Sequence, residues 1–420
     1  MGSDRECVSK AKLAISFVEC LDVSVMTSTV TQMRPRLLFL ITEDWTFWEI
    51  RRDLARIARD MGYEVTIATR VTAHAERIKQ EGFRLIPIMM LREGRSPLRE
   101  LLTILELVRI YRRVRPQIVQ HVAMKPVLYG SFAAWVTRIP VVINVFGGLG
   151  YAFTDRPQEI SVLRAILRRG LRWAIALSRS VVVVQNPDDR NVLVREHIAP
   201  SSQVRLIAGS GVDVQRFVPV DPPTGDPIVM LVGRMLWDKG VGEFVDAVVR
   251  LRKRNVCARF VLVGRCDQGN PTAIAEAQIQ RWTHDHGIEW WGHREDLPEV
   301  IGRATLVVLP SYREGLPKVL LEAAACGKAV IATDVPGCRE VVQHRKTGLL
   351  VPVRDPVALA DAIANLLTDH ELRAVMGASG REFAVREHSK EKIGQHFLDL
   401  YQERLGLVGS VSGCHLQGTA

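Results

Sequence analysis

The feature that most constrains the fold of this chain is the alternation of short β-branched runs with longer helical patterns. The runs are RLLFLIT (36–42), EVTIAT (64–69), RLIPI (84–88), QIVQH (117–121), VVINVF (141–146), SVVVVQ (180–185), IVMLVG (228–233), RFVLVG (259–264), TLVVLP (305–310) and AVIAT (329–333). Strands separated by helices in this way form parallel βαβ units. The sequence therefore predicts an α/β fold.

The alternation is interrupted once, in DVQRFVPVDPPTGDP (213–227), where four prolines cluster. A chain of 420 residues is also too long for one ordinary core. We therefore predict two doubly wound, Rossmann-like domains that face each other across a cleft, with ligand-binding loops at the carboxyl ends of their strands. The predicted boundaries are a disordered extension (1–32), a first domain (33–212), a linker (213–227), a second domain (228–388), a C-terminal helix packing back on the first domain (389–406) and a tail (407–420). Met33, directly before the first strand, is a candidate translation start.

The net charge of +10 is unevenly distributed. Residues 1–210 hold 31 Lys and Arg against 20 Asp and Glu, whereas residues 211–420 hold 25 against 26. In SVLRAILRRGLRWAIALSR (161–179) the arginines interleave with Leu, Ile and Trp, which favours a membrane-surface helix over a nucleic-acid reader. A core helix with a solvated basic face is the open alternative.

Targeting and metal signals are weak. No apolar run reaches the roughly 18 residues of a spanning helix, and Glu19 and Asp22 interrupt the apolar stretch 12–26. The seven cysteines are scattered, which suits a reducing compartment and gives no zinc-ligand spacing. We expect a cytoplasmic protein without a bound metal.

Two glycines and two cations follow the strand 228–233, in GRMLWDKG (233–240). Gly233 and Gly240 allow close backbone approach, the next helix supplies a positive dipole end, and Arg234 and Lys239 supply counter-charge, which together suit phosphate binding. An ordinary basic surface loop is the alternative. The loop is not a Walker A motif, and FGGLGY (146–151) lacks the dinucleotide fingerprint.

Two glutamates flank an apolar segment in YREGLPKVLLEAAACGKAV (312–330). Pro317 and Gly327 bracket a helix that is apolar on most sides, so Glu322 is predicted to be buried and to need a partner, either a ligand or an arginine from across the fold. At about 1.5 Å per residue, Glu314 lies up to about 12 Å from Glu322. Glycosidase carboxylates need about 5–9.5 Å. The pair instead fits the two ends of an extended ligand.

Together with PSYREGLPKVLLEAAACGKAVIATDVPGCREVV, TGLLVP and SGVDVQRF, these motifs resemble the family-4 retaining glycosyltransferases of GT-B fold, from about Met33 to Arg404. HVAMKPVLYGSFAA (121–134), NVFGGLGYAF (144–153) and GNPTAI (269–274) are similar to enzymes that extend polyprenyl-diphosphate-linked saccharides of bacterial surface glycans, such as O-antigen, on undecaprenyl carriers.

The resemblance implies roles for individual residues. Arg234 and Lys239, with Gly233, would bind the diphosphate of a UDP-sugar. Glu322 would bind the ribose. Glu314, with the backbone of Gly315 and Leu316, would bind the transferred hexose or N-acetylhexosamine. The Gly147 and Gly148 loop would close over the phosphates or the acceptor, and His121 would lie near the donor sugar. In the first loop, Glu49 and Ile50 depart from the family pattern, which puts the acceptor identity in doubt.

The resemblance also implies transfer with retention and a lipid-linked saccharide as acceptor. Because such an acceptor lies at an anionic inner membrane leaflet, the positive charge of the first half predicts docking there rather than on nucleic acid. No Asp-x-Asp metal motif is present, so we expect neither a metal nor another cofactor. The alternatives are a nucleotide-sugar 2-epimerase and a non-enzymatic basic protein that binds membrane or nucleic acid.

Overall fold

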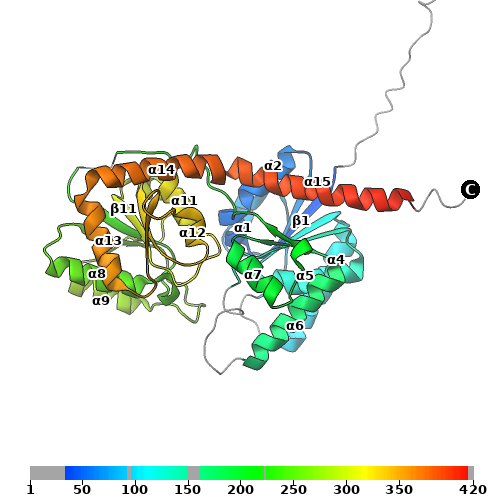
Figure 1. The fold of residues 1–420 in the computed structure, drawn as a ribbon. Coiled ribbons are helices and arrows are strands. Elements are labelled where there is room, and N and C mark those ends of the chain that lie inside the picture. Colours follow the sequence, from blue (N-terminus) through cyan, green and yellow to red (C-terminus); the bar gives the residue numbers. More distant parts are fainter. Residues whose placement is uncertain (1–33, 92–95, 150–160, 222–223, 415–420) are drawn as a thin grey trace, which may run out of the picture. The chain divides into compact units, whose positions relative to one another are not determined.

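The computed structural model describes residues 34–91, 96–149, 161–221 and 224–414 (Figure 1). The expected extension 1–32 and the candidate start Met33 lie outside the described residues, as do 415–420 of the expected tail. The described residues from Pro35 onward form one compact unit.

The first half of this unit is built on a parallel sheet that has seven strands within the described residues, in the order β3-β2-β1-β4-β5-β6-β7. The strands are β1 (Arg36–Glu43), β2 (Glu64–Arg70), β3 (Arg84–Pro87), β4 (Ile118–Val122), β5 (Val141–Val145), β6 (Val181–Val184) and β7 (Val204–Leu206). The helices are α1 (Asp44–Ile50), α2 (Arg52–Asp60), α3 (Ala75–Gln80), α4 (Pro97–Val114), α5 (Met124–Thr137), α6 (Ser161–Ser178) and α7 (Pro187–Arg195).

The second half repeats this plan with six described strands in the order β10-β9-β8-β11-β12-β13, again parallel. The strands are β8 (Ile228–Val232), β9 (Arg259–Val263), β10 (Glu289–Trp290), β11 (Leu306–Leu309), β12 (Ala329–Thr333) and β13 (Gly348–Val351). The helices are α8 (Val241–Lys253), α9 (Glu276–His286), α10 (Leu297–Gly302), α11 (Lys318–Ala325), α12 (Cys338–Val341), α13 (Pro356–Thr368) and α14 (His370–His388). The predicted α/β fold with two doubly wound sheets is confirmed.

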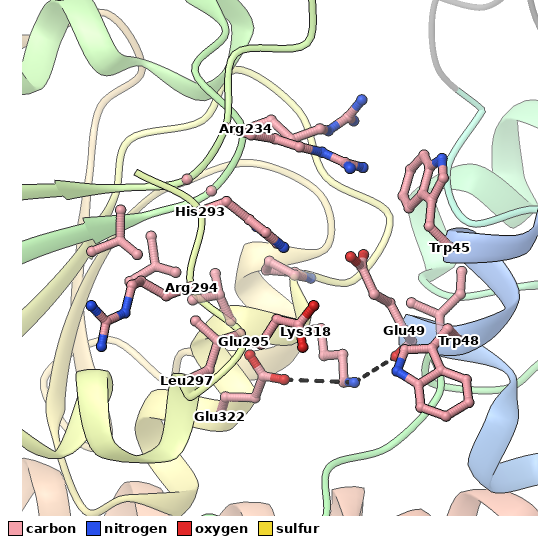
Figure 2. Close-up of a pocket in the computed structure, with 18 of the residues that line it drawn as sticks. Trp45, Trp48, Glu49, Arg234, His293, Arg294, Glu295, Leu297, Lys318 and Glu322 are labelled. Atoms are coloured by element: carbon pink, nitrogen blue, oxygen red, sulfur yellow. Dashed lines mark hydrogen bonds and ion pairs between the residues drawn. The ribbon is translucent and has the colours of Figure 1, made fainter. Parts of the chain in front are cut away.

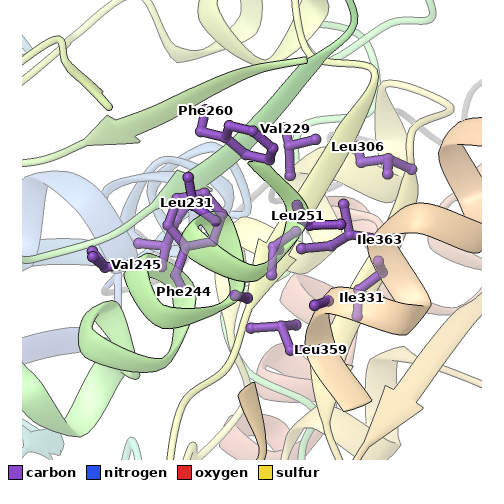
Figure 3. Close-up of a cluster of buried hydrophobic side chains, with 14 of the residues drawn as sticks. Val229, Leu231, Phe244, Val245, Leu251, Phe260, Leu306, Ile331, Leu359 and Ile363 are labelled. Atoms are coloured by element: carbon purple, nitrogen blue, oxygen red, sulfur yellow. The ribbon is translucent and has the colours of Figure 1, made fainter. Parts of the chain in front are cut away.

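Each sheet is buried on both faces, which explains why its strands read as continuous apolar runs. In β1, Leu37 and Phe39 point into one apolar cluster and Leu38 and Leu40 into another, because side chains alternate along a strand. In β8, Val229 and Leu231 join Phe244 and Leu251 of α8 in a cluster shown in Figure 3. Burial of one such side chain stabilises the fold by about 1.5–3 kcal/mol.

The last described helix, α15 (Lys390–Cys414), continues beyond the predicted end at residue 406. It packs against α2, and its buried side chains belong to the apolar cluster under β1. At the α14–α15 junction, Val212 N donates to His388 O at 2.8 Å and Lys390 N donates to Val212 O at 2.9 Å. The last described helix therefore packs on the same half as the first described strand.

Within the described ranges, no helix combines the length and the apolar character that a membrane span requires.

Candidate active site

The carboxyl ends of the strands border a cavity of about 570 Å³ whose lining comes from both halves. Trp45, Trp48 and Glu49 of α1 lie on one side, and Arg234, His293, Lys318 and Glu322 of the second half face them (Figure 2). Of the ten residues predicted from the sequence as site residues, six line this cavity: Gly233, Arg234, Lys239, Glu314, Leu316 and Glu322.

The turn after β8 carries the two cations into the cavity. Gly240 has φ of +71°, and a Cβ there would lie 2.0 Å from Pro310 O, so only glycine fits this approach to the loop after β11. Arg234 Nη1 lies 2.6 Å from Asp267 Oδ2, and Lys239 Nζ lies 2.5 Å from Glu314 Oε1. A guanidinium has five N–H donors and an ammonium has three. Each cation therefore keeps donors for an anionic ligand while it stays paired with its carboxylate.

Glu322 is buried on α11, with 5% of its surface exposed, as predicted. Burial raises the pKa of its carboxyl group, which the positive charges of Lys318 and Arg216 oppose and the charge of Glu49 reinforces. Its ion-pair partner is Lys318, one turn earlier on α11, with Nζ 3.6 Å from Oε1, and not the arginine from across the fold that was the alternative. Lys318 Nζ also donates to the carbonyl of Glu49 at 2.7 Å and so joins α11 to α1 (Figure 2).

His121 does not line the cavity. Its ring is fully buried beside α5, where a Cβ on Gly130 would lie 2.6 Å away. Asn144 Oδ1 accepts from Nδ1 at 2.7 Å, which leaves Nε2 to accept from the Tyr111 hydroxyl at 2.9 Å. Burial lowers the pKa of His121 to about 4, so the imidazole is neutral near pH 7. This geometry favours a structural role over contact with a donor sugar.

Gly147, Gly148 and Gly315 lie against one another instead of lining the cavity. A Cβ on Gly315 would lie 1.9 Å from Gly147 O, and a Cβ on Gly148 would lie 3.2 Å from Gly315 N. Asn186 Nδ2 donates to Gly315 O at 2.8 Å. The two glycine loops therefore join the halves next to Glu314, and the expected closure of the first loop over phosphates or acceptor stays a prediction.

Comparisons with known proteins agree with this architecture. Residues 36–180 match the family model "Glycosyl transferase 4-like", and residues 226–369 match "Glycosyl transferases group 1". The chain is 25% identical to a Campylobacter jejuni N,N'-diacetylbacillosaminyl-diphospho-undecaprenol α-1,3-N-acetylgalactosaminyltransferase, over 87% of this chain and 98% of that protein. It is 22% identical to the Staphylococcus aureus capsular polysaccharide glycosyltransferase CapM, over 79% and 88% of the two chains.

Two solved structures share the fold. Anabaena HepE in complex with UDP has a TM-score of 0.70 at 17% identity, covering 88% of this chain and 100% of its own. Sucrose-phosphate synthase from Thermosynechococcus elongatus has a TM-score of 0.71 at 22% identity, covering 89% and 100%. The chain belongs to the glycosyltransferases of GT-B fold.

The sequence analysis missed several residues that line the cavity of this glycosyltransferase. Arg265 follows β9 as Arg234 follows β8, and its guanidinium lies 4.6 Å from the ring centroid of Trp45. Arg77 Nη1 lies 3.1 Å from Glu295 Oε2 on the same border. The repeated LVGR at the two strand ends is a signal that could have identified Arg265, since these ends meet at one edge of the sheet.

The first loop of the glycosyltransferase forms the wall opposite Glu322. Glu49 and Ile50, which depart from the family pattern, both line the cavity. The Arg52 guanidinium lies over the Trp48 ring, 4.6 Å from the ring centroid. This wall presents aromatic rings and arginine side chains to any ligand that binds in the cavity against the second half.

Proposed function

We propose that this glycosyltransferase moves a hexose or N-acetylhexosamine from a UDP-sugar to a polyprenyl-diphosphate-linked saccharide, with retention at the anomeric carbon. The observation that carries the proposal is the convergence of Arg234, Lys239, Glu314 and Glu322 on one cavity. Support for the substrates comes from the C. jejuni relative, whose name specifies an undecaprenol-linked acceptor, and from HepE structures that hold UDP or UDP-glucose.

In the proposed complex the ligand lies across the second half. Glu322 accepts from the ribose hydroxyls, Arg234 and Lys239 hold the diphosphate, and Glu314 with the Gly315 and Leu316 backbone holds the sugar. The buried Glu322 is suited to this role, because a hydrogen bond to a carboxylate contributes about 1.5–3 kcal/mol.

The chemical step breaks the bond between the anomeric carbon and the leaving phosphate oxygen, and forms a bond from that carbon to the acceptor oxygen on the same face. The acceptor proton passes to a phosphate oxygen of the leaving UDP. Arg234 and Lys239 stabilise the negative charge that develops on the diphosphate, where one fixed donor can be worth about 10²–10³ in rate.

The test is incubation of the protein with a panel of labelled UDP-sugars and membrane lipid extract, with assignment of the product anomer by NMR. A lipid-linked product of unchanged anomeric configuration is expected, and an inverted product would refute retention. A reaction with donor alone checks the 2-epimerase alternative, which would release an isomerised sugar without acceptor.

We also propose that the diphosphate is neutralised by Arg234, Lys239 and the α8 N-terminus without a divalent cation. In the part of the chain that the structure describes, no group of three or more His, Cys, Asp or Glu side chains is arranged to hold a metal ion. Transfer rates are therefore expected to stay within about twofold in excess chelator, a change well below the roughly 1.4 kcal/mol of a tenfold effect. A strict requirement for added Mg²⁺ or Mn²⁺ would refute this proposal.

A further inference from the structure

Three helices on one side of the first sheet carry a dense set of exposed apolar side chains. α5 packs against both α4 and α6, and buried residues of α4 and α5 share one apolar cluster while those of α5 and α6 share another (Figure 1). We call their outward surface the α4–α6 face. Its exposed apolar residues are Leu98, Leu101, Leu102 and Leu105 of α4, Phe132, Trp135 and Val136 of α5, and Ile166, Trp173 and Leu177 of α6.

This arrangement is unusual for a helix layer that faces water. The outward side of such a helix is ordinarily polar, yet the exposed positions of α5 are aromatic or aliphatic, with Trp135 46% exposed. The rings of Phe132 and Trp135 contact each other, with centroids 5.5 Å apart, and Trp173 on α6 is 60% exposed. A contiguous exposed apolar surface marks an interaction site.

The charge of the α4–α6 face has one sign. Its exposed arginines are Arg99, Arg109, Arg112 and Arg113 of α4 and Arg169 and Arg172 of α6, with Arg115, Arg138 and Arg179 directly after the three helices. The two acidic side chains of α4, Glu100 and Glu106, are half-buried, where Glu100 pairs with Lys125 at 2.8 Å and Glu106 accepts from Met89 N at 3.0 Å. Among the described side chains of α4, α5 and α6, no carboxylate is exposed. Next to α6, Glu196 at the end of α7 pairs with Arg168 at 2.9 Å. The face therefore combines apolar anchors with a large excess of positive charge.

We infer that the α4–α6 face docks on an anionic lipid surface, with Phe132, Trp135, Trp173 and the α4 leucines at the level of the headgroups and the arginines on lipid phosphates. Apolar side chains beside arginines suit a membrane interface, where acyl chains lie next to anionic headgroups. A second copy of the chain is disfavoured, because two such faces would bring like charges together. The inference deepens the proposed function, since a polyprenyl-linked acceptor lies in such a surface.

The sequence predicted docking through the basic first half and singled out residues 161–179, leaving open whether that helix is a membrane-surface helix or a core helix with a solvated basic face. The structure buries one side of this helix and exposes the other. Leu171 and Ile175 of α6 are buried in the protein, while Ile166, Trp173 and Leu177 face outward. The contributions of α4 and α5 become visible only when the fold places them beside α6.

The inference is tested by sedimenting the full chain with vesicles of phosphatidylcholine, alone or mixed with phosphatidylglycerol. Wild-type protein should bind the mixed vesicles, with one component that salt removes and one that resists salt. The variant Arg112→Glu/Arg113→Glu/Arg169→Glu should bind about a hundredfold more weakly or worse at low salt, since each arginine contributes about fivefold. The variant Phe132→Ser/Trp135→Ser/Trp173→Ser should lose the salt-resistant component.

Matched controls come from the second half of the chain. Arg250→Glu on α8 reverses the charge of an exposed arginine, and Val375→Ser on α14 replaces an apolar residue that is 55% exposed. Both variants should leave vesicle binding unchanged. Brominated lipids should quench the tryptophan fluorescence of the wild-type protein. The quenched fraction should be smaller in Trp135→Phe and Trp173→Phe, whereas Trp237→Phe should be quenched as much as wild type. Circular dichroism confirms that each variant is folded.

Several results would overturn the inference: wild-type binding that the face variants leave unchanged, equal binding to neutral vesicles, or a dimer in ultracentrifugation that the apolar variant abolishes. Failure of the proposed function is distinguishable from these. Vesicle binding is measured without donor or acceptor, and transfer is measured in detergent, where the face variants should keep wild-type rates. Docking without any transfer would refute the function and leave the surface assigned.

Discussion

At the scale of single residues, Glu322 is expected to favour ligand binding and to lower the stability of the fold. Its folded pKa is raised above the ordinary value of 4.5 by burial. For an acid, this means that the folded state loses stability as pH rises from the unfolded pKa to the folded one, and stays less stable above it. At pH 7.5, Glu322→Gln should therefore raise Tm, because the amide has no charge to bury. UDP affinity should fall about ten- to hundredfold, as expected for one lost bond to a charged group.

A control for this prediction is Glu340→Gln on α12, since burial also raises the pKa of Glu340 and that residue does not line the cavity. It should stabilise the protein without weakening UDP binding. Calorimetry measures the Tm of both variants, and titration with UDP measures their affinity for the nucleotide. Unchanged UDP affinity in Glu322→Gln would mean that the buried carboxylate serves the fold alone.

Arg234 and Lys239 should affect turnover far more than folding. Both cations are partly exposed, with 34% of the Arg234 side chain and 22% of the Lys239 side chain accessible, so their truncation removes little buried surface. Arg234→Ala and Lys239→Ala are each expected to lower kcat about 10²–10³-fold, because the charge on the leaving diphosphate loses a fixed partner. Initial rates are compared with Arg250→Ala and Lys253→Ala on α8, which should match wild type. Near-normal transfer by both site variants would remove the assigned role.

What the sequence could predict at this scale was the chemistry carried by local patterns. The burial of Glu322 follows from the apolar surroundings of its helix, and the position of Arg234 follows from a strand end. His121 shows the opposite case. Its position at a strand end was evident, but the side it faces is set by contacts with Tyr111 of α4 and Asn144 of β5, which only the packing of these elements brings together. Lys318 was missed because its contact with Glu49 joins distant segments.

At the scale of elements, the loops after strands determine where the site residues lie, and two glycines there should respond differently to substitution. A Cβ on Gly315 would collide with Gly147 O, whereas a Cβ on Gly233 meets nothing within 4 Å and points into open cavity space. Gly315→Ala should destabilise the fold by about 1–3 kcal/mol, as overpacking does, and displace Glu314. Gly233→Ala should fold normally yet bind UDP more weakly.

Urea unfolding and UDP titration separate these two glycine effects. If Gly233→Ala bound UDP as wild type does, the phosphate loop would not approach the ligand as proposed. If Gly315→Ala kept wild-type stability, the contact between the two glycine loops would be less constrained than the structure indicates.

The ten strands expected from apolar runs are all present, with ends that differ by a residue or two. Most of these runs are buried along their length, although the edge strand β3 is partly exposed. The strands β7, β10 and β13 were not predicted. β7 and β10 have only three and two residues, too few for a periodic pattern to emerge. All three strands lie at or next to the edges of their sheets, and their pairing depends on a neighbouring strand that is already in place.

At the scale of the whole molecule, the chain closes on itself through α15. Ile393, Phe397 and Tyr401 of this last helix are buried with β1 and α2, about 350 residues earlier in sequence. The Arg51 guanidinium, itself fully buried, lies 5.4 Å from the Phe397 ring centroid. The apolar cluster on this side of the first sheet is therefore completed by the last described helix.

Phe397→Ala tests this dependence in graded form. Removing a fully buried phenylalanine costs about 3–5 kcal/mol through lost transfer energy and the cavity left behind. That loss is a large fraction of the roughly 5–15 kcal/mol that stabilises a domain. The midpoint of urea unfolding should fall accordingly, while Phe132→Ala, at a half-exposed site on α5, should change stability by less than about 1 kcal/mol. Equal midpoints for Phe397→Ala and wild type would mean that the first half folds without the helix that covers it.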